Sequence, residues 1–217
     1  MASAEQRAGQ VFDLTGGRLS LDFVNTLGGQ RLTRPKEQLA SYADLVSFAR
    51  QAGILNPDRA RRLLEQSARH PKKAAVVLER ARELREAIYR IWVAQIRAER
   101  PADADMELLN ARLADSLKQQ RVAKHGERFT LTWADEDGLE SLLWPIAKSA
   151  AELLTGEEAQ QIRECEASST GECSWLFIDE TRNHSKRWCS MASCGNRAKA
   201  RRHYQRAREG AEPHGHG

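Results

Sequence analysis

Apolar residues recur at helical spacing along most of the first 155 residues of the chain. The longest such pattern starts at Pro71 and reaches about Glu99, and its apolar positions trace one continuous stripe. The stripe consists of Ala74, Val77, Leu78, Ala81, Leu84, Ile88, Ile91, Trp92 and Ile96. The pattern predicts one long helix that begins with a proline in its first turn and ends before Pro101.

Shorter helices are predicted on both sides of this one, over residues 20–27, 41–52, 57–69, 103–119 and 137–154. Asn56 and Pro57 form a typical helix start, because an asparagine side chain caps the first turn and proline is favoured at the first helical position. Pro145 falls inside the last of these helices and predicts a kink there.

One segment alternates in the way that is typical of strands. In residues 122–133, Phe129, Leu131 and Trp133 alternate with polar residues, and residues 125–126 can form a tight turn. A small β-hairpin is therefore expected. The leucine and aromatic stripes of all these elements are expected to lie in the core.

The pattern divides the chain into a helical domain over residues 1–160, a small second domain over 161–210 and a flexible tail over 211–217. The polar segment 156–163 is expected to form the hinge between the domains. The tail is rich in Gly, Pro and His, which predicts a loose end.

The composition is that of a globular protein, with 41% hydrophobic and 29% charged residues. No stretch reaches the roughly 18 consecutive apolar residues that a membrane span needs. The N-terminal residues also lack the basic and then apolar arrangement of a secretion signal. We therefore expect a cytoplasmic protein that does not associate with membranes.

Positive charge is concentrated towards the C-terminus. Between Arg182 and Arg208 there are nine Lys and Arg residues and no Asp or Glu, whereas the other 190 residues contain 25 basic and 30 acidic side chains. A mildly acidic body with a strongly basic segment is typical of a protein that binds a polyanion. The alternative is a basic surface that is merely solvated.

All four cysteines of the chain lie close to this basic segment, at Cys165, Cys173, Cys189 and Cys194. A chain without an export signal is not expected to form stable disulfides, because the cytosol is reducing. Two cysteine pairs separated by a short strand (residues 175–178) and a turn suit a structural Zn²⁺ ion, whose tetrahedral shell four thiolates complete. Buried free thiols and redox-active cysteines are the alternatives.

A basic helix is predicted directly after the last cysteine. Gly195 can adopt the positive φ that a turn around a thiolate needs, and Asn196 is a suitable N-cap. Residues 197–209 contain no Gly or Pro, and Tyr204 is their only large apolar residue, so this helix must lie on the surface. The expected fold class is mainly α. A helical N-terminal domain with one small β-hairpin precedes a small zinc finger, of treble-clef or ribbon type, that ends in a basic helix.

No catalytic motif is present, since the chain has neither a phosphate-binding glycine loop nor a nucleophile elbow. His70 and His125 fall at a helix break and at a turn. Asp22 and Asn25 are three residues apart on one helix and are candidates for lining a ligand pocket, although such residues more often cap backbone groups. The protein is not expected to be an enzyme.

The sequence RWCSMASCGNR, at residues 187–197, resembles the CGNR zinc finger, which is named after the residues found here at 194–197. Residues 173–179 and 181–183 are similar to the first half of that finger. Residues 17–27 (GRLSLDFVNTL) resemble the opening of the all-helical ABATE domain, which usually precedes this finger. Leu143-Trp144-Pro145-Ile146-Ala147 and Leu153-Leu154 resemble the end of that domain.

The resemblance implies a bacterial transcription regulator of the stress response that binds DNA through its zinc finger, while the helical domain senses a ligand or stress signal. Composition alone permits RNA equally. Nucleic-acid contacts are expected from Arg182, Lys186, Arg187, Asn196, Arg197, Lys199, Arg201, Arg202, Arg206 and Arg208. The helix cannot place all of these in one groove, because 197, 201 and 208 share one face and 199, 202 and 206 share another.

Two further interpretations are compatible with the sequence. The finger could be a protein-docking module whose basic helix meets an acidic surface. The helical domain could instead be an enzyme or a small-molecule carrier to which the finger is an accessory. A small-molecule effector and a homodimer formed through the long helix are also compatible with the pattern.

Overall fold

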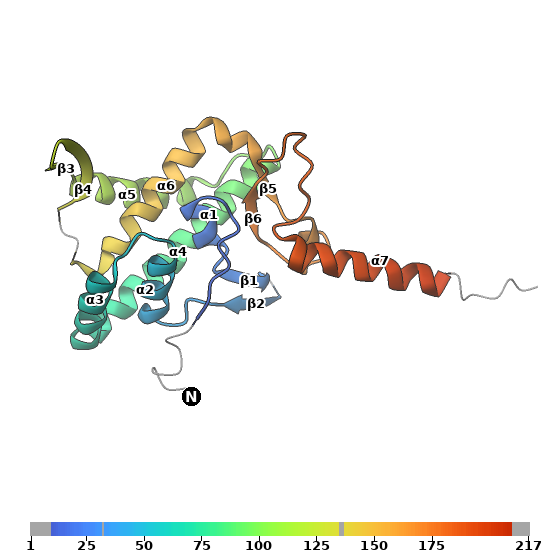
Figure 1. The fold of residues 1–217 in the computed structure, drawn as a ribbon, viewed down its shortest axis with the longest axis horizontal. Coiled ribbons are helices and arrows are strands. Elements are labelled where there is room, and N and C mark those ends of the chain that lie inside the picture. Colours follow the sequence, from blue (N-terminus) through green and yellow to red (C-terminus); the bar gives the residue numbers. More distant parts are fainter. Residues whose placement is uncertain (1–9, 32, 135–136, 210–217) are drawn as a thin grey trace, which may run out of the picture.

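The long helix α4 (Pro71–Ile96) is central to the helical domain in the computed structural model of the chain, which describes residues 10–31, 33–134 and 137–209 (Figure 1). The predicted stripe is buried from Ala74 to Trp92, and Ile96 is partly buried against the same core. The helix ends three residues before Glu99, because the chain turns at Ala98 with a φ of 54°.

The other predicted helices surround α4. They are α1 (Leu19–Val24), α2 (Tyr42–Gln51), α3 (Pro57–Arg69), α5 (Asp103–Gln119) and α6 (Leu143–Thr155). The predicted cap of α3 is confirmed, since the Asn56 side chain accepts a hydrogen bond of 2.9 Å from the backbone N–H of Arg59. A capping box between Ser41 and Asp44 starts α2.

The prediction that the first helix extends to Leu27 is wrong. Leu27 instead opens strand β1 (Leu27–Gln30), which pairs antiparallel with β2 (Arg34–Glu37). Gly29 has a φ of 72°, and a Cβ atom there would lie 2.7 Å from the carbonyl oxygen of Arg34, so a helical path is excluded and only glycine fits. The pattern missed β2 because all four of its residues are exposed and none alternates with the core.

The predicted kink at Pro145 is also absent. A 3₁₀ turn (Leu139–Leu142) precedes α6, so Pro145 is the third residue of the α-helix rather than an interior one. The N–H groups of the first helical turn have no partner within the helix, and a proline there therefore costs no hydrogen bond.

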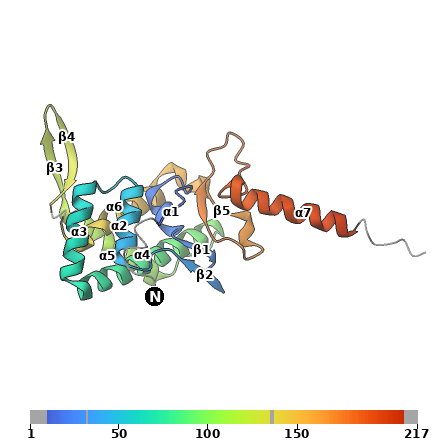
Figure 2. The same ribbon diagram turned by 60° about the horizontal axis from the view of Figure 1, so that its bottom comes forward.

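The predicted hairpin is confirmed as β3 (Gln120–His125) and β4 (Arg128–Trp133), which turn at Gly126 with a φ of 58°. Its apolar face is not part of the core, contrary to the prediction. Phe129 is 70% exposed and Leu131 is 61% exposed, and Leu117 of α5 is 53% exposed. The hairpin projects from the end of the molecule opposite to the C-terminal helix, where nothing in the described chain covers it (Figures 1 and 2).

The C-terminal domain is a short β-ribbon followed by a helix. Strand β5 (Ile162–Glu164) pairs antiparallel with β6 (Leu176–Ile178), and 3₁₀ turns lie at Glu157–Gln161 and Glu166–Ser168. A π-helical turn (Met191–Gly195) then leads into α7 (Asn196–Glu209). The fold class is therefore as predicted, whereas the tail at 211–217 lies outside the described residues.

The segment expected to form the hinge between the domains ends at strand β5, which contacts the helical core. Ile162, Leu176 and Ile178 are buried in the same hydrophobic core as the helices. One face of the β-ribbon thus belongs to the helical core, whereas Phe177 on its other face packs in a separate cluster around the four cysteines. Within the described ranges no helix is both long and apolar enough to cross a membrane.

Candidate metal centre and basic helix

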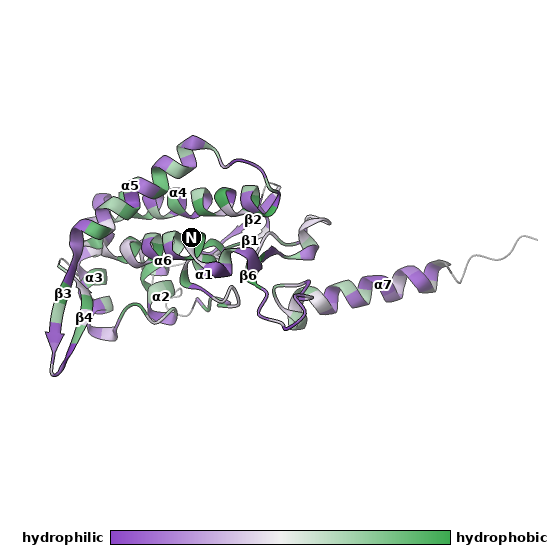
Figure 3. Ribbon diagram, turned by 90° about the horizontal axis from the view of Figure 1, so that it is seen from above, coloured by the Kyte–Doolittle hydropathy of each residue, from purple (hydrophilic) through white to green (hydrophobic). Residues whose placement is uncertain are grey.

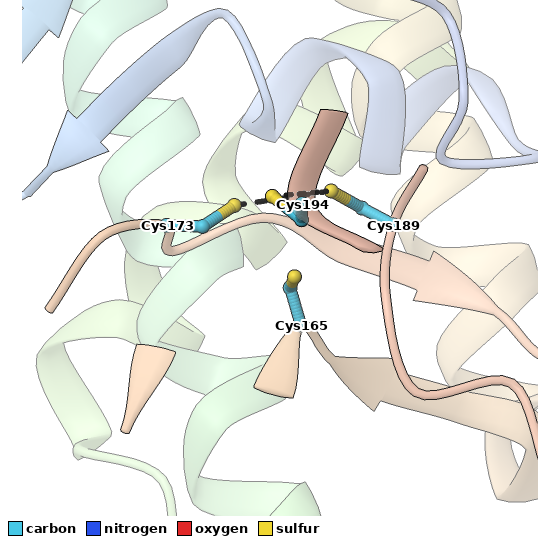
Figure 4. A group of neighbouring side chains, drawn as sticks. All are labelled: Cys165, Cys173, Cys189 and Cys194. Atoms are coloured by element: carbon cyan, nitrogen blue, oxygen red, sulfur yellow. Dashed lines mark hydrogen bonds between the residues drawn. The ribbon is translucent and has the colours of Figure 1, made fainter. Parts of the chain in front are cut away.

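The four cysteine side chains converge on one point (Figure 4). Cys165 follows β5 and Cys173 precedes β6. Cys189 lies just before the turn that leads into α7, and Cys194 lies within that turn. All four residues are buried, and their sulfur atoms lie within 4.8 Å of one another. The β-ribbon and the π-helical turn therefore form a single four-sulfur centre.

The sulfur spacing fits a tetrahedral zinc ion. A Zn–S bond of about 2.3 Å implies a tetrahedron with edges of about 3.8 Å. The Sγ atoms of Cys173 and Cys189 are 3.8 Å apart, and those of Cys189 and Cys194 are 3.6 Å apart. With four sulfur ligands the shell is closed, so the zinc is structural and has no position left for a substrate.

The acid–base properties of the four thiols indicate that the centre needs a cation. Hydrogen bonding to Cys165 and burial raise the pKa of the Cys173 and Cys189 thiols. The same hydrogen bonds lower the pKa of Cys165, because its thiolate is the acceptor that its neighbours share. Four thiolates cannot coexist at this distance unless a divalent cation displaces their protons.

A buried carboxylate stabilises the loop between the cysteine pairs. Asp179 accepts hydrogen bonds of 3.0 Å from the backbone N–H groups of Thr181 and Lys186, and another from the Thr181 hydroxyl. Burial alone would raise the pKa of Asp179, but these hydrogen bonds hold it below its usual value. The sequence predicts only a turn here, although an Asp side chain that accepts from the backbone two residues later is a common feature of such turns.

The entry into α7 differs from the prediction at two residues. Asn196 is not an N-cap, because it has helical dihedral angles and its side chain donates to the carbonyl oxygen of Ala192 at 3.3 Å. Gly195 does not have a positive φ. A Cβ atom there would lie 2.7 Å from the sulfur of Met191, whose side chain packs across the glycine. The π-helical turn thus runs continuously into the helix and needs no separate cap.

Some of the predicted nucleic-acid-binding residues have partners within the finger. The Arg197 guanidinium donates to Cys194 Sγ at 3.0 Å, and Arg187 and Arg201 form ion pairs with Glu166 and Glu172. The Lys186 ammonium lies 4.6 Å from the ring centroid of Phe177. The Arg197 contact offsets negative charge on the sulfur centre, and the Arg201 ion pair fastens α7 to the finger.

The remaining cationic side chains are exposed and have no carboxylate partner among the described residues. They are Arg182, Lys199, Arg202, Arg206 and Arg208. Beyond its first turns α7 extends away from the body of the protein (Figure 1), and its surface is mostly hydrophilic along its length (Figure 3). The helix is therefore a projecting cationic rod.

Asp22 and Asn25 do not form the ligand pocket proposed from the sequence. The Asn25 side chain is 2% exposed and makes two hydrogen bonds with the backbone of Leu176, at 2.8 Å to its carbonyl oxygen and 2.9 Å from its N–H group. Asp22 accepts a 2.8 Å hydrogen bond from the N–H of Gly16. Both residues serve the backbone, and Asn25 joins the helical domain to the finger.

Comparison with protein-family models finds two matches. Residues 17–157 match the ABATE family, whose description is "Putative stress-induced transcription regulator". Residues 161–207 match the CGNR zinc finger. These matches confirm the resemblance seen in the sequence motifs. No curated protein is significantly similar to the chain.

Proposed function

The chain belongs to the ABATE family and carries a CGNR zinc finger, and from this premise we propose that it is a transcription regulator that binds DNA through α7. The proposal depends on one observation, the cationic charge of α7 that no carboxylate in the described chain neutralises. Lys199, Arg202, Arg206 and Arg208 all belong to this group. Unpaired cations on a projecting helix attract phosphates, because each contact releases counterions from the DNA.

The zinc centre gives this helix its position. Zinc, when bound, supplies a rigid crosslink between the two cysteine pairs. Cys194 lies two residues before the start of α7, and the π-helical turn continues into the helix without a break. Arg197 and Arg201 then hold the first turns against Cys194 and Glu172. The rest of the helix is free to meet a polyanion.

Fluorescence anisotropy on a labelled 20-base-pair DNA duplex tests the proposal. The zinc-loaded protein should bind, and its affinity should fall steeply as KCl is raised from 50 to 200 mM. Replacement of Lys199 and Arg206 by alanine should weaken binding. The slope of log affinity against log salt should decrease by the amount expected for about two lost phosphate contacts. The matched control replaces Lys124 and Arg128 of the distant β3–β4 hairpin by alanine. It should leave the affinity for the duplex and its salt dependence unchanged.

The same measurement separates the rival interpretations. Tighter binding to an RNA duplex would identify RNA as the partner. If the protein prefers an acidic polypeptide such as polyglutamate to DNA at equal charge, the finger is a protein-docking module. An affinity for duplex DNA that does not change with salt would contradict the proposal.

A cavity favours a sensing role for the helical domain as a second function. It has a volume of about 700 Å³ and lies where α3, α4, α5 and the start of α6 meet. Leu139 and Trp144 form part of its buried floor, and Lys72 and Lys73 lie at its rim. The Oε1 atom of Gln66 is buried there without a hydrogen-bond partner among the described residues. Such a lining suits a small carboxylate with an apolar body and a hydrogen-bond donor.

Thermal denaturation with salicylate, which has all three features, tests this second function. The melting temperature should rise with ligand concentration, as mass action requires. Lys73→Glu should abolish the rise, whereas Lys118→Glu, which lies outside the cavity lining, should not. Equal responses of the two variants would exclude the cavity as the site.

A further inference from the structure

We propose that the β1–β2 hairpin of the helical domain and the first turns of α7 form one phosphate-binding cleft, so that the helical domain itself contacts the nucleic-acid backbone. We call this site the composite cleft, and it is lined by Gly29, Gln30, Arg34, Glu172, Arg197, Ala200 and Arg201. The inference rests on the proposed function and extends the binding surface beyond the zinc finger.

The hairpin is fixed in position against the finger. The Gln30 side chain packs on Gly171, where a Cβ atom would lie 3.4 Å from Gln30 Nε2. A Cβ atom at Gly28 would lie 3.7 Å from the indole nitrogen of Trp175. The Asn25 hydrogen bonds to Leu176 lie just before β1. The cleft is therefore built into the shared fold and does not depend on a chance approach of two domains.

The cleft is open and has a volume of about 490 Å³. Its walls come from two parts of the chain that are far apart in the sequence, with β1 and β2 on one side and α7 and Glu172, which lies before β6, on the other. Gly29 and Ala200 are the smallest residues in the lining, and neither has a side chain that could fill the cleft. A phosphate group can thus approach the guanidinium groups without displacing a large side chain.

The charge of the cleft is positive. Three guanidinium groups, from Arg34, Arg197 and Arg201, face one carboxylate, that of Glu172. Glu172 pairs with Arg201, and Arg197 donates to the sulfur of Cys194. Arg34 is exposed and has no carboxylate partner in the described part of the chain. It is therefore the cation of the cleft that is available to an incoming anion.

The cleft continues along one face of α7. Residues 197, 201, 204 and 208 follow one another at helical spacing, so Tyr204 and Arg208 extend the line that starts at the cleft. Tyr204 is 70% exposed. From Arg197 to Arg208 the helix rises about 16 Å, which is about the axial rise of five base-pair steps of B-DNA. Arg34 lengthens this track at its inner end, and the extended shape fits a phosphodiester backbone.

The same anisotropy assay tests the composite cleft. Arg34→Ala should weaken binding of the duplex about threefold to tenfold and reduce the slope of log affinity against log salt by about 0.9. Arg34→Glu should weaken binding further. Arg128→Ala is the matched control, because Arg128 is also an exposed hairpin arginine and its strand β4 lies at the far end of the molecule. Zinc content and circular dichroism of each variant verify the fold.

A second variant gives a change of opposite sign. Glu172→Gln removes the only carboxylate of the cleft lining and frees Arg201, so affinity for the duplex should increase. A purely structural role of Glu172 would not produce tighter binding.

The outcomes distinguish this inference from the function on which it rests. If the Lys199 and Arg206 replacements weaken binding but Arg34→Glu binds like the wild type, the composite cleft is refuted and the proposed function stands. If the wild-type protein does not bind the duplex at 50 mM KCl, the proposed function fails and the cleft fails with it.

Discussion

Asn25 shows how one side chain can replace a stretch of strand pairing. Its amide donates to the carbonyl oxygen of Leu176 and accepts from the N–H of the same residue. Both partners are buried, so the loss of the amide leaves two backbone groups without water or protein partners. The contact spans 151 residues of sequence and joins the two domains at the level of a single residue.

Asn25→Ala is therefore expected to destabilise the protein by about 2–4 kcal/mol, since each unsatisfied group costs about 1–3 kcal/mol. Urea denaturation monitored by circular dichroism measures this loss. Asn183→Ala, at an exposed loop position, is the control and should stay within about 0.5 kcal/mol of the wild type. A loss as small as that of the control would show that the amide does not hold the domains together.

Asp22 makes stability depend on pH. Burial raises its pKa from 3.8 to about 6, against the lowering effect of the hydrogen bond from Gly16, and nearby Asp13 raises it further. Because the folded pKa lies above the unfolded value, the stabilisation is full below about pH 4 and is lost as the pH rises through 6.

Asp22→Asn keeps an acceptor for Gly16 but cannot ionise. Above pH 6 the variant should be about 1–2 kcal/mol more stable than the wild type, after allowance for partial exposure, and this gain should shrink towards pH 4. Melting temperatures of both proteins from pH 4 to 8 provide the test, and taking their difference cancels the titration of the cysteine centre. A difference that does not vary with pH would contradict the raised pKa.

At the scale of elements, the β3–β4 hairpin forms regular paired strands although its apolar face is not part of the core. Val122 and Leu131 face each other across the strands, and both are more than half exposed. Trp133, at the base of the hairpin, packs against the body, with its ring centroid 5.9 Å from that of Trp144. Alternation therefore identified the strands correctly, although their apolar face has no partner in the described chain.

Polar replacement of this face should cost little. We expect Phe129→Ser and Leu131→Thr each to change the free energy of unfolding by less than about 0.5 kcal/mol, because both side chains remain mostly exposed to water in the folded protein. Phe23→Ser, at a fully buried position, should cost more than about 3 kcal/mol. The three variants are compared by urea denaturation. A loss above 2 kcal/mol at Phe129 would mean that the face is covered in solution.

At the scale of the whole molecule, strand β6 connects the zinc centre to the helical core. Strand β6 contributes Leu176 and Ile178 to the core, and Cys173 anchors the segment that leads into it. Ile178 also donates its N–H to the carbonyl oxygen of Gly16 at 3.0 Å. Loss of the metal should therefore weaken the helical domain as well as the finger.

Removal of zinc by a chelator such as TPEN is expected to lower the melting temperature, followed by the helical circular dichroism signal, by about 10 °C. Release of Leu176 and Ile178 from the core costs about 3–6 kcal/mol, which corresponds to a shift of this size in a protein of this length. Cys189→Ser should act in the same way. Readdition of zinc should restore the wild-type protein but not the variant. An unchanged helical melting transition would show that the domains are independent.

The local features of this protein follow directly from its amino-acid sequence. Periodic apolar residues specified α4 and its neighbours, Asn56 and Pro57 specified the start of α3, and the clustered cysteines specified the metal centre. Each of these signals depends on residues that are close in the chain, where spacing translates directly into position on a helix or around an ion.

The way in which these parts combine follows from long-range packing. It joined Asn25 to Leu176, merged the ribbon with the helical core, left Phe129 exposed and placed Arg34 beside α7. These arrangements depend on contacts between residues far apart in sequence, and the local pattern does not record which distant surface a side chain will meet. The physical reason is that burial and charge pairing are settled only when the whole chain is packed.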